Sequence, residues 1–178
     1  MIIFSPMRSV KIDRLLRVGI GLLSVVLIYV LYAAIHQRVV VAGDSAPDFN
    51  VTAENGRTVS VHNFGGKLLI LHFWASWCAP CIEETPSLNA FTQEFAEKGV
   101  VVLGVSVDKD VNAYQRFLQQ FRPAFLTARD SQIHEDYGTF MYPETYFIDP
   151  NGRVLRKLDV AGINWMDPQL TSWVKTQL

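Results

Sequence analysis

Two short apolar runs constrain the fold of this chain more than any other feature. They are LLILHF at residues 68–73 and VVVLGVSV at residues 100–107, and both are almost continuously apolar and rich in β-branched side chains. Strands of this composition belong to sheets that helices cover on both faces. The helical pattern between the two runs makes them a parallel pair with a right-handed crossover. The sequence therefore predicts an α/β domain.

Helical periodicity supplies the covering layers, in three segments that follow the strands. The apolar residues expected to face inward are Leu88, Phe91, Phe95 and Ala96, then Val111, Tyr114, Phe117, Leu118 and Phe121, and finally Leu170, Trp173, Val174 and Leu178. Asp167 is the predicted N-cap of the last helix and Pro168 its first residue.

Two β-hairpins complete the predicted sheet. Residues 49–61 place β-forming residues on both sides of Asn55-Gly56, and residues 144–160 do the same around Pro150-Asn151-Gly152. A short strand at residues 124–128 and a helical turn near residues 131–137 lie between them. The fold class is α/β, with a central mixed β-sheet flanked by helices and an N-terminal β-hairpin.

Residues 18–35 are eighteen consecutive residues without a charge. At about 1.5 Å per helical residue they nearly match the hydrocarbon thickness of a bilayer, so they predict one transmembrane helix. Four basic residues precede the run, and this bias places the N-terminus in the cytoplasm and the domain outside it. A signal peptide cleaved after Val40-Val41-Ala42 is the alternative, but the run is long for one and ends well before that site.

The predicted organisation is a basic cytoplasmic N-terminus at residues 1–17, an anchor at 18–35, a linker at 36–45 and one globular domain at 46–178. Five basic residues against Asp13 give residues 1–38 a net charge of +4, which leaves −5 on the rest of a chain whose total is −1. An acidic domain without a basic cluster has no electrostatic footprint for nucleic acid.

The chain has two cysteines, Cys78 and Cys81, placed between the first apolar strand and a helix. Unsatisfied N–H groups and the helix dipole stabilise a thiolate at that position, and a thiolate is the attacking species in disulfide exchange. We therefore expect Cys78 to attack and Cys81 to resolve the mixed disulfide. A zinc site needs more ligands than this chain groups together, and a structural disulfide here would close too small a loop to stabilise much. No metal is expected, and no cofactor beyond the redox-active disulfide.

The sequence around the cysteines resembles the thioredoxin active site, with Phe73-Trp74-Ala75 before WCAPC and Pro86 after it. The whole domain from about Ala46 resembles the membrane-tethered TlpA/ResA/CcmG (DsbE) thioredoxin-like proteins. The segments that carry this resemblance are APDF, ENGRTVSV, GKLLILHFWASWCAPCIEETP, VVVLGVSVD and YPETYFIDPNGRV.

This resemblance implies a thioredoxin-like fold and a thiol-disulfide oxidoreductase, acting as a protein-disulfide reductase outside the cytoplasm, on the periplasmic or outer side of the inner (cytoplasmic) membrane. It implies protein disulfides as clients, with apocytochrome c among the candidates, and thus a role in cytochrome c biogenesis. A membrane thiol transporter of the CcdA/DsbD kind is the implied electron donor, because the compartment is oxidising.

The resemblance also places Glu84 where that family keeps an acidic residue near the active site. A carboxylate there can relay a proton to or from the resolving thiol, and its charge opposes thiolate formation. The alternative is that Glu83 and Glu84 only favour the first turn of a helix through its dipole. His72 occupies a strand position where thioredoxin has a buried acid and many relatives have asparagine. It is a candidate proton relay, with a hydrogen-bonded structural histidine as the alternative.

Tyr142-Pro143 resembles the cis-proline segment of thioredoxin-like folds, which leaves the Tyr142 backbone free to pair with a client peptide beside Cys78. A glutamate directly after this proline, here Glu144, resembles the pattern of the cytochrome-maturation branch of the family. The alternative is that Glu144 is only a solvated charge at the start of a strand. Trp77 is expected to be exposed and to touch substrate. The chain departs from the family where Met141 replaces the usual glycine, which adds bulk at the expected substrate groove.

Two other functions remain as alternatives. A peroxiredoxin-like thiol peroxidase shares APDF-like openings but needs a cysteine in a Pro-x-x-x-Thr-x-x-Cys setting, which this chain lacks. A Sco-like copper metallochaperone uses CxxxC with a later histidine, and the cysteines here are one residue closer.

Overall fold

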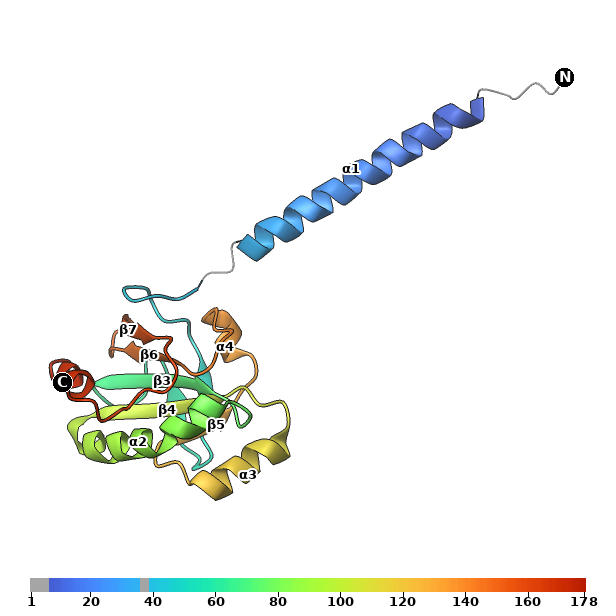
Figure 1. Ribbon diagram of the computed structural model, residues 1–178. Helices are drawn as coiled ribbons and strands as arrows, with labels where there is room; N and C mark the ends of the chain where they lie inside the picture. Colours follow the sequence, from blue (N-terminus) through green and yellow to red (C-terminus); the bar gives the residue numbers. More distant parts are fainter. Residues whose placement is uncertain (1–6, 36–38) are drawn as a thin grey trace. The chain divides into compact units, whose positions relative to one another are not determined.

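The computed structural model describes residues 7–35 and 39–178, which fall into two units divided after Arg38 (Figure 1). The first unit contains a single helix, α1 (Met7–Ile35), which begins well before the predicted span. By length and composition, its residues Asp13–Tyr32 are apolar enough to cross a membrane, with a mean hydropathy of 2.2. The predicted N-terminus at 1–17 and linker at 36–45 lie partly outside the described residues.

The second unit is built on a five-stranded sheet in the order β5-β4-β3-β6-β7. Strands β3, β4 and β5 are parallel, whereas β6 runs antiparallel to β3 and β7 antiparallel to β6. The predicted mixed sheet and its C-terminal hairpin are therefore confirmed. The strands are β3 (Leu68–Trp74), β4 (Val100–Ser106), β5 (Leu126–Arg129), β6 (Glu144–Ile148) and β7 (Val154–Leu158).

Every residue of β3 and β4 is buried, as their composition predicts. Gly104 occupies β4 because its neighbours leave no room for a side chain. A Cβ there would lie 2.6 Å from Cε2 of Phe125 and 2.9 Å from Nε1 of Trp74.

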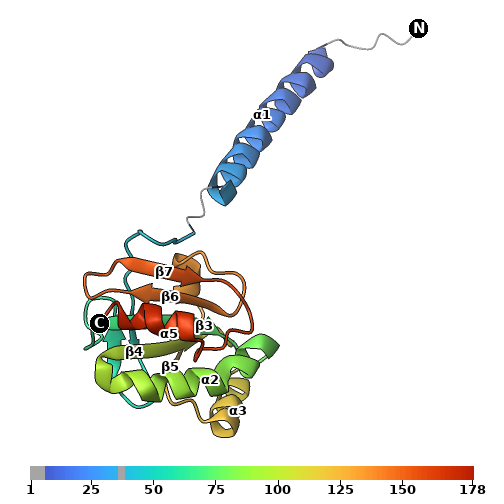
Figure 2. The same ribbon diagram turned by 60° about the vertical axis from the view of Figure 1, so that its left-hand side comes forward.

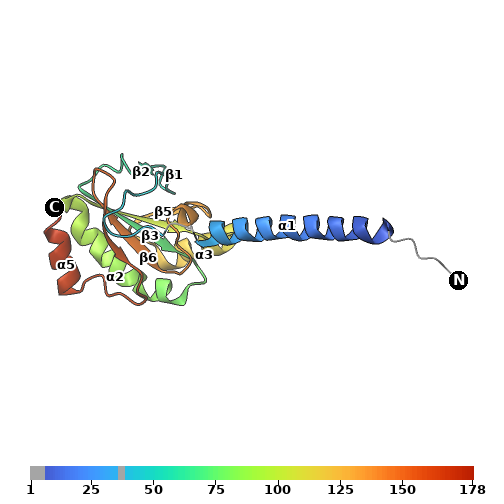
Figure 3. The ribbon, with the colours of Figure 1, turned by 90° about the horizontal axis from the view of Figure 1, so that it is seen from above.

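Helices α2 (Ala79–Phe95) and α5 (Pro168–Lys175) cover one face of the sheet (Figures 2 and 3). A 3₁₀ turn, η1 (Ala96–Lys98), follows α2. The side chain of Asp167 accepts hydrogen bonds from the first turn of α5, which confirms it as the N-cap. The buried core of this face consists of Leu68, Ile70, Leu88, Phe91, Phe95, Val100, Val102, Phe125, Phe147, Trp165, Leu170 and Val174.

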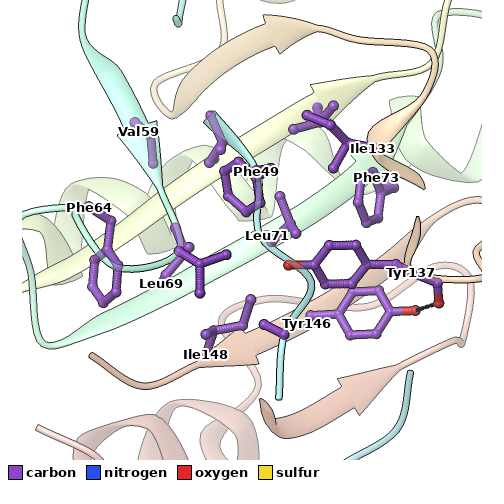
Figure 4. Packing of buried hydrophobic residues seen from close by; sticks show 14 of the residues in the cluster. Phe49, Val59, Phe64, Leu69, Leu71, Phe73, Ile133, Tyr137, Tyr146 and Ile148 are labelled. Carbon is purple, nitrogen blue, oxygen red and sulfur yellow. Dashed lines mark hydrogen bonds between the residues drawn. The ribbon is translucent and has the colours of Figure 1, made fainter. Parts of the chain in front are cut away.

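The other face of the sheet packs against the hairpin of β1 (Asn50–Thr52) and β2 (Thr58–Ser60) and against α4 (Ile133–Asp136). The hairpin is antiparallel, and its turn places Gly56 at a φ of 83°, which confirms the predicted Asn55-Gly56 turn. Figure 4 shows this second core, to which β3 contributes Leu69, Leu71 and Phe73. Because side chains alternate along a strand, His72 points to the opposite face, toward α2.

Helix α3 (Val111–Phe121) packs against the end of β3 through Tyr114 and Phe117. Their ring centroids lie 5.9 and 4.2 Å from that of Trp74. Two residues expected to face inward do not, namely Ala96, which is exposed at the start of η1, and Val111. Val111 is the first residue of the helix and is 47% exposed, so the inward stripe begins one turn later at Tyr114.

Candidate active site

Cys78 and Cys81 form a disulfide at the start of α2, with their Cα atoms 5.3 Å apart. Cys78 is the N-cap of the helix, and the backbone N–H of Cys81 donates to its Sγ over 3.3 Å. This donor belongs to the group of amides that a helix leaves unsatisfied at its N-terminus. The predicted placement of the first sulfur is confirmed, and the arrangement favours negative charge on that sulfur.

A buried carboxylate fixes the loop that leads from β3 to Cys78. Asp108, which follows β4, accepts hydrogen bonds from the backbone N–H and the hydroxyl of Ser76, both at 2.8 Å. The hydroxyl of Ser106 donates to the same carboxylate over 2.6 Å. Sequence reasoning missed this residue. The available signal was an acid in the loop after a buried strand, which neighbours the strand that leads to the cysteines.

Glu84 and His72 meet beneath the disulfide, and both are buried. Oε1 of Glu84 lies 3.4 Å from Nε2 of His72, whose Nδ1 lies 2.9 Å from the hydroxyl of Thr145 on β6. Glu84 belongs to the same face of α2 as Cys81, one turn further along. The structure therefore brings together three of the residues selected from the sequence: Cys81, Glu84 and His72.

Burial dominates the electrostatics of this pocket. It raises the pKa of Glu84 to about 7, an effect partly offset by the backbone of Ile163 and the indole of Trp165. Burial also lowers the pKa of His72 to about 3. Loss of solvation penalises the charged form of each group, so this pocket favours a neutral imidazole at His72. A carboxyl with a pKa near neutrality can both give and accept a proton at physiological pH.

Tyr142 and Trp77 lie next to the disulfide, whose cysteines are both buried, at 5% and 2% exposed. The Tyr142–Pro143 peptide bond is cis. Tyr142 packs against the cluster that contains both cysteines, and its ring centroid lies 5.8 Å from that of Trp77. Trp77 is 67% exposed. The buried redox centre therefore has an exposed aromatic side chain next to it.

Glu144 lies elsewhere. Its side chain is buried on the hairpin face of the sheet, because it alternates with Thr145, which faces His72. The carboxylate accepts from Nζ of Lys157 at 2.7 Å and from the hydroxyl of Thr139 at 3.1 Å, and it also contacts the hydroxyl of Tyr146. The alternative of a solvated charge is therefore wrong, and the side chain is not turned toward the disulfide face.

Within residues 7–35 and 39–178, no group of three or more histidine, cysteine or acidic side chains is arranged to hold a metal ion. The redox centre is the Cys78–Cys81 disulfide. A CxxC disulfide at the N-terminus of a helix, on a mixed sheet with a cis-proline segment beside it, defines a thioredoxin-like thiol-disulfide oxidoreductase.

Comparison with known proteins agrees with this class. Residues 42–157 match the AhpC/TSA family. The chain is 33% identical over 118 residues to the thiol-disulfide oxidoreductase ResA of Bacillus thuringiensis subsp. konkukian, covering 65% of this chain and 68% of that protein. It is 34% identical over 113 residues to the thioredoxin-like protein YneN of Bacillus subtilis, covering 62% of this chain and 66% of that protein.

Among solved structures, a protein from Chlorobium tepidum described as a thiol:disulfide interchange protein DsbE superposes with a TM-score of 0.69 and 30% identity. The match covers 79% of this chain and 99% of that one. The chain therefore belongs to the AhpC/TSA family, and within it to the TlpA/ResA/CcmG-like proteins of thioredoxin fold. It is an oxidoreductase whose CxxC pair carries the chemistry.

Replacing Asp108 by alanine tests its role in the loop. Asp108→Ala removes the acceptor of three hydrogen bonds and leaves a buried donor at Ser106 and half-buried donors at Ser76, so we expect a loss of about 2–3 kcal/mol in the free energy of unfolding. The matched control is Asp110→Ala, which removes the exposed N-cap of α3 and should cost about 1 kcal/mol. Urea unfolding measures both. A loss at Asp108 no greater than the control would contradict the assigned role.

Glu84 should make stability fall as pH rises. Between pH 4.5, its ordinary pKa, and about 7, its folded pKa, the unfolded chain has lost the Glu84 proton and the folded chain still holds it. The free energy of unfolding of wild type minus that of Glu84→Gln should therefore fall by up to about 3 kcal/mol over this window. Urea unfolding at a series of pH values measures the difference. A difference that does not change with pH would show that the carboxyl has an ordinary pKa.

Proposed function

We propose that this protein is a protein-disulfide reductase, held by α1 in the cytoplasmic membrane with its N-terminus in the cytoplasm and its thioredoxin-like domain outside. The single observation that carries the proposal is the hydrogen bond from the Cys81 amide to Sγ of Cys78 at the start of α2. In the reduced protein the same amide would stabilise a Cys78 thiolate, the species that attacks disulfides. The uncharged apolar run within α1 supports the anchor at residues 18–35, preceded by residues 1–17 and followed by a linker at 36–45 and the domain at 46–178.

The reaction begins when the Cys78 thiolate attacks one sulfur of a client disulfide. The S–S bond of the client breaks, its second sulfur leaves as a thiolate and takes a proton from water, and a mixed disulfide joins the client to Cys78. The exposed ring of Trp77 and the backbone of Tyr142 beside the cis Pro143 would hold the client strand during this step.

The second step releases the client. The Cys81 thiol gives its proton to the Glu84 carboxylate, and the resulting thiolate attacks Sγ of Cys78. The mixed disulfide breaks, the client leaves as a dithiol, and two electrons have passed from the protein to the client. The protein ends with the Cys78–Cys81 disulfide that the structure contains.

Return to the dithiol requires a donor, because the cycle consumes one dithiol per client. In the extracytoplasmic position proposed here, a membrane thiol transporter of the CcdA/DsbD kind is the proposed donor. Family resemblance supports protein clients with a paired cysteine motif, and apocytochrome c is the proposed example, which would place the protein in cytochrome c biogenesis. Glu144 is proposed to support the client segment indirectly, because its buried network holds the strand that follows Pro143.

The proposal is tested with the full chain in detergent, charged with dithiothreitol and freed of excess reagent. We expect it to reduce an oxidised CxxCH peptide with a stoichiometry of about one disulfide per chain. Cys78→Ser should abolish the reaction, and Cys81→Ser should accumulate the mixed disulfide with the peptide. Mass spectrometry of quenched samples measures both products. Rapid consumption of hydrogen peroxide with no peptide reduction would instead favour the thiol peroxidase alternative.

A further inference from the structure

His72 is a buried histidine whose two ring nitrogens both have neighbours. On one side Nδ1 lies 2.9 Å from Oγ1 of Thr145, and on the other Nε2 lies 3.4 Å from Oε1 of Glu84. The imidazole is 2% exposed. Two aromatic rings meet it edge-on, Trp165 with a centroid distance of 5.9 Å and Phe125 at 6.5 Å. The ring plane is therefore fixed by packing, with Nε2 within 3.4 Å of the carboxyl.

The carboxyl of Glu84 has no other side-chain group to accept a proton from it among the described residues. Neither of its oxygens makes a hydrogen bond of regular geometry within the described part of the chain. Two of its neighbours, the indole of Trp165 and the backbone of Ile163, lower its pKa, as N–H donors do. A protonated carboxyl carries one O–H donor that needs an acceptor when buried. The ring nitrogen of His72 at 3.4 Å is in position to be that acceptor.

Charged neighbours do not explain the pairing. Helix α2 presents the disulfide and Glu84 to this pocket, with Glu83 exposed on another side of the helix. Strand β3 contributes His72 to the pocket, β6 contributes Thr145, and the segment before α5 contributes Trp165. The charged pair of Glu144 and Lys157 lies on the opposite face of the sheet. Among the described residues, no charged side chain contributes to the raised pKa of Glu84.

We propose that His72 is a positioning residue for Glu84, whose carboxyl O–H donates to Nε2 while Nδ1–H of the neutral ring donates to Thr145. This inference deepens the proposed function, on which it rests only for its kinetic consequence. The hydrogen bond holds the acid in one orientation and favours its protonated form. When Glu84 is ionised, its charge faces the lone pair of Nε2, which makes the carboxylate a better base for the proton of the Cys81 thiol in the resolving step.

The tautomer of His72 tests the proposal without any assay of activity. In the full chain with its disulfide intact, ¹⁵N NMR of labelled histidine should show a neutral ring protonated at Nδ1 and bare at Nε2. The signal of Nε2 should shift as Glu84 titrates, and His72→Leu identifies the resonance by its loss. A ring protonated at Nε2, or protonated at both nitrogens near neutral pH, would overturn the proposal.

A second test uses the carboxyl itself. In ¹³C-labelled protein, where Glu84→Gln identifies the signal, His72→Leu should lower the titration midpoint of Glu84 by roughly one pH unit, because the acid loses the acceptor of its proton. His62→Leu makes the same change at an exposed histidine and should leave the midpoint in place. The pH midpoint of the resolving step of disulfide exchange should move with that of Glu84.

The sign of the shift decides the outcome. A rise in the midpoint in His72→Leu would mean that His72 donates to the carboxylate, and no shift would mean that the histidine is only structural. Either result overturns the inference. Failure of peptide reduction with the expected tautomer present would refute the proposed function and leave the pairing intact.

Discussion

The hydrogen bond between the Cys81 amide and Sγ of Cys78 depends on several parts of the fold at once. Cys78 has to be the N-cap of α2, which requires β3 to end at Trp74 and the next three residues to turn. Asp108 fixes that turn from the neighbouring strand through Ser76. Because α2 then runs along the sheet, the residue one turn after Cys81 is driven into the core. The position of the sulfur and the burial of Glu84 thus have one structural cause.

The pocket beneath the disulfide contains an acid and a base that both favour neutrality. The pH dependences that they give to the free energy of unfolding have opposite signs. Glu84, whose folded pKa is raised, loses stability as pH rises from 4.5 to about 7, whereas His72, whose folded pKa is lowered, gains stability as pH rises from about 3 to 6.5. Between pH 4.5 and 6.5 the two slopes cancel, so this pair makes the free energy of unfolding nearly independent of pH in that range.

Much of the fold could be predicted from the sequence because its signals are local. Continuous apolar strands, the Asn55-Gly56 and Pro150-Asn151-Gly152 turns and the Asp167 cap each depend on a few consecutive residues. The two cysteines could be placed for the same reason, since a strand and a helix flank them directly. The position of Glu84 on the Cys81 face follows from helical spacing alone.

Other parts of the site depend on partners that are far away in the sequence. Trp165 reaches the Glu84 pocket from the segment before α5, and no local pattern announces it. The sequence places Glu144 directly after Pro143, beside the expected client segment. Its carboxylate instead pairs with Lys157 on the adjacent strand, in a buried network on the other face of the sheet. Asp108 was overlooked because its partner Ser76 lies in a loop of another strand. In each case tertiary pairing, which sequence spacing does not encode, decides the environment of a charged or polar group.

The rate of alkylation of Cys78 as a function of pH in the reduced protein shows whether the helix N-terminus stabilises the Cys78 thiolate. We expect a Cys78 pKa clearly below the value of about 8.5 for a free thiol, with rapid reaction near neutral pH. A Cys78 that titrates at about 8.5 or higher, or that stays unreactive when reduced, would contradict it.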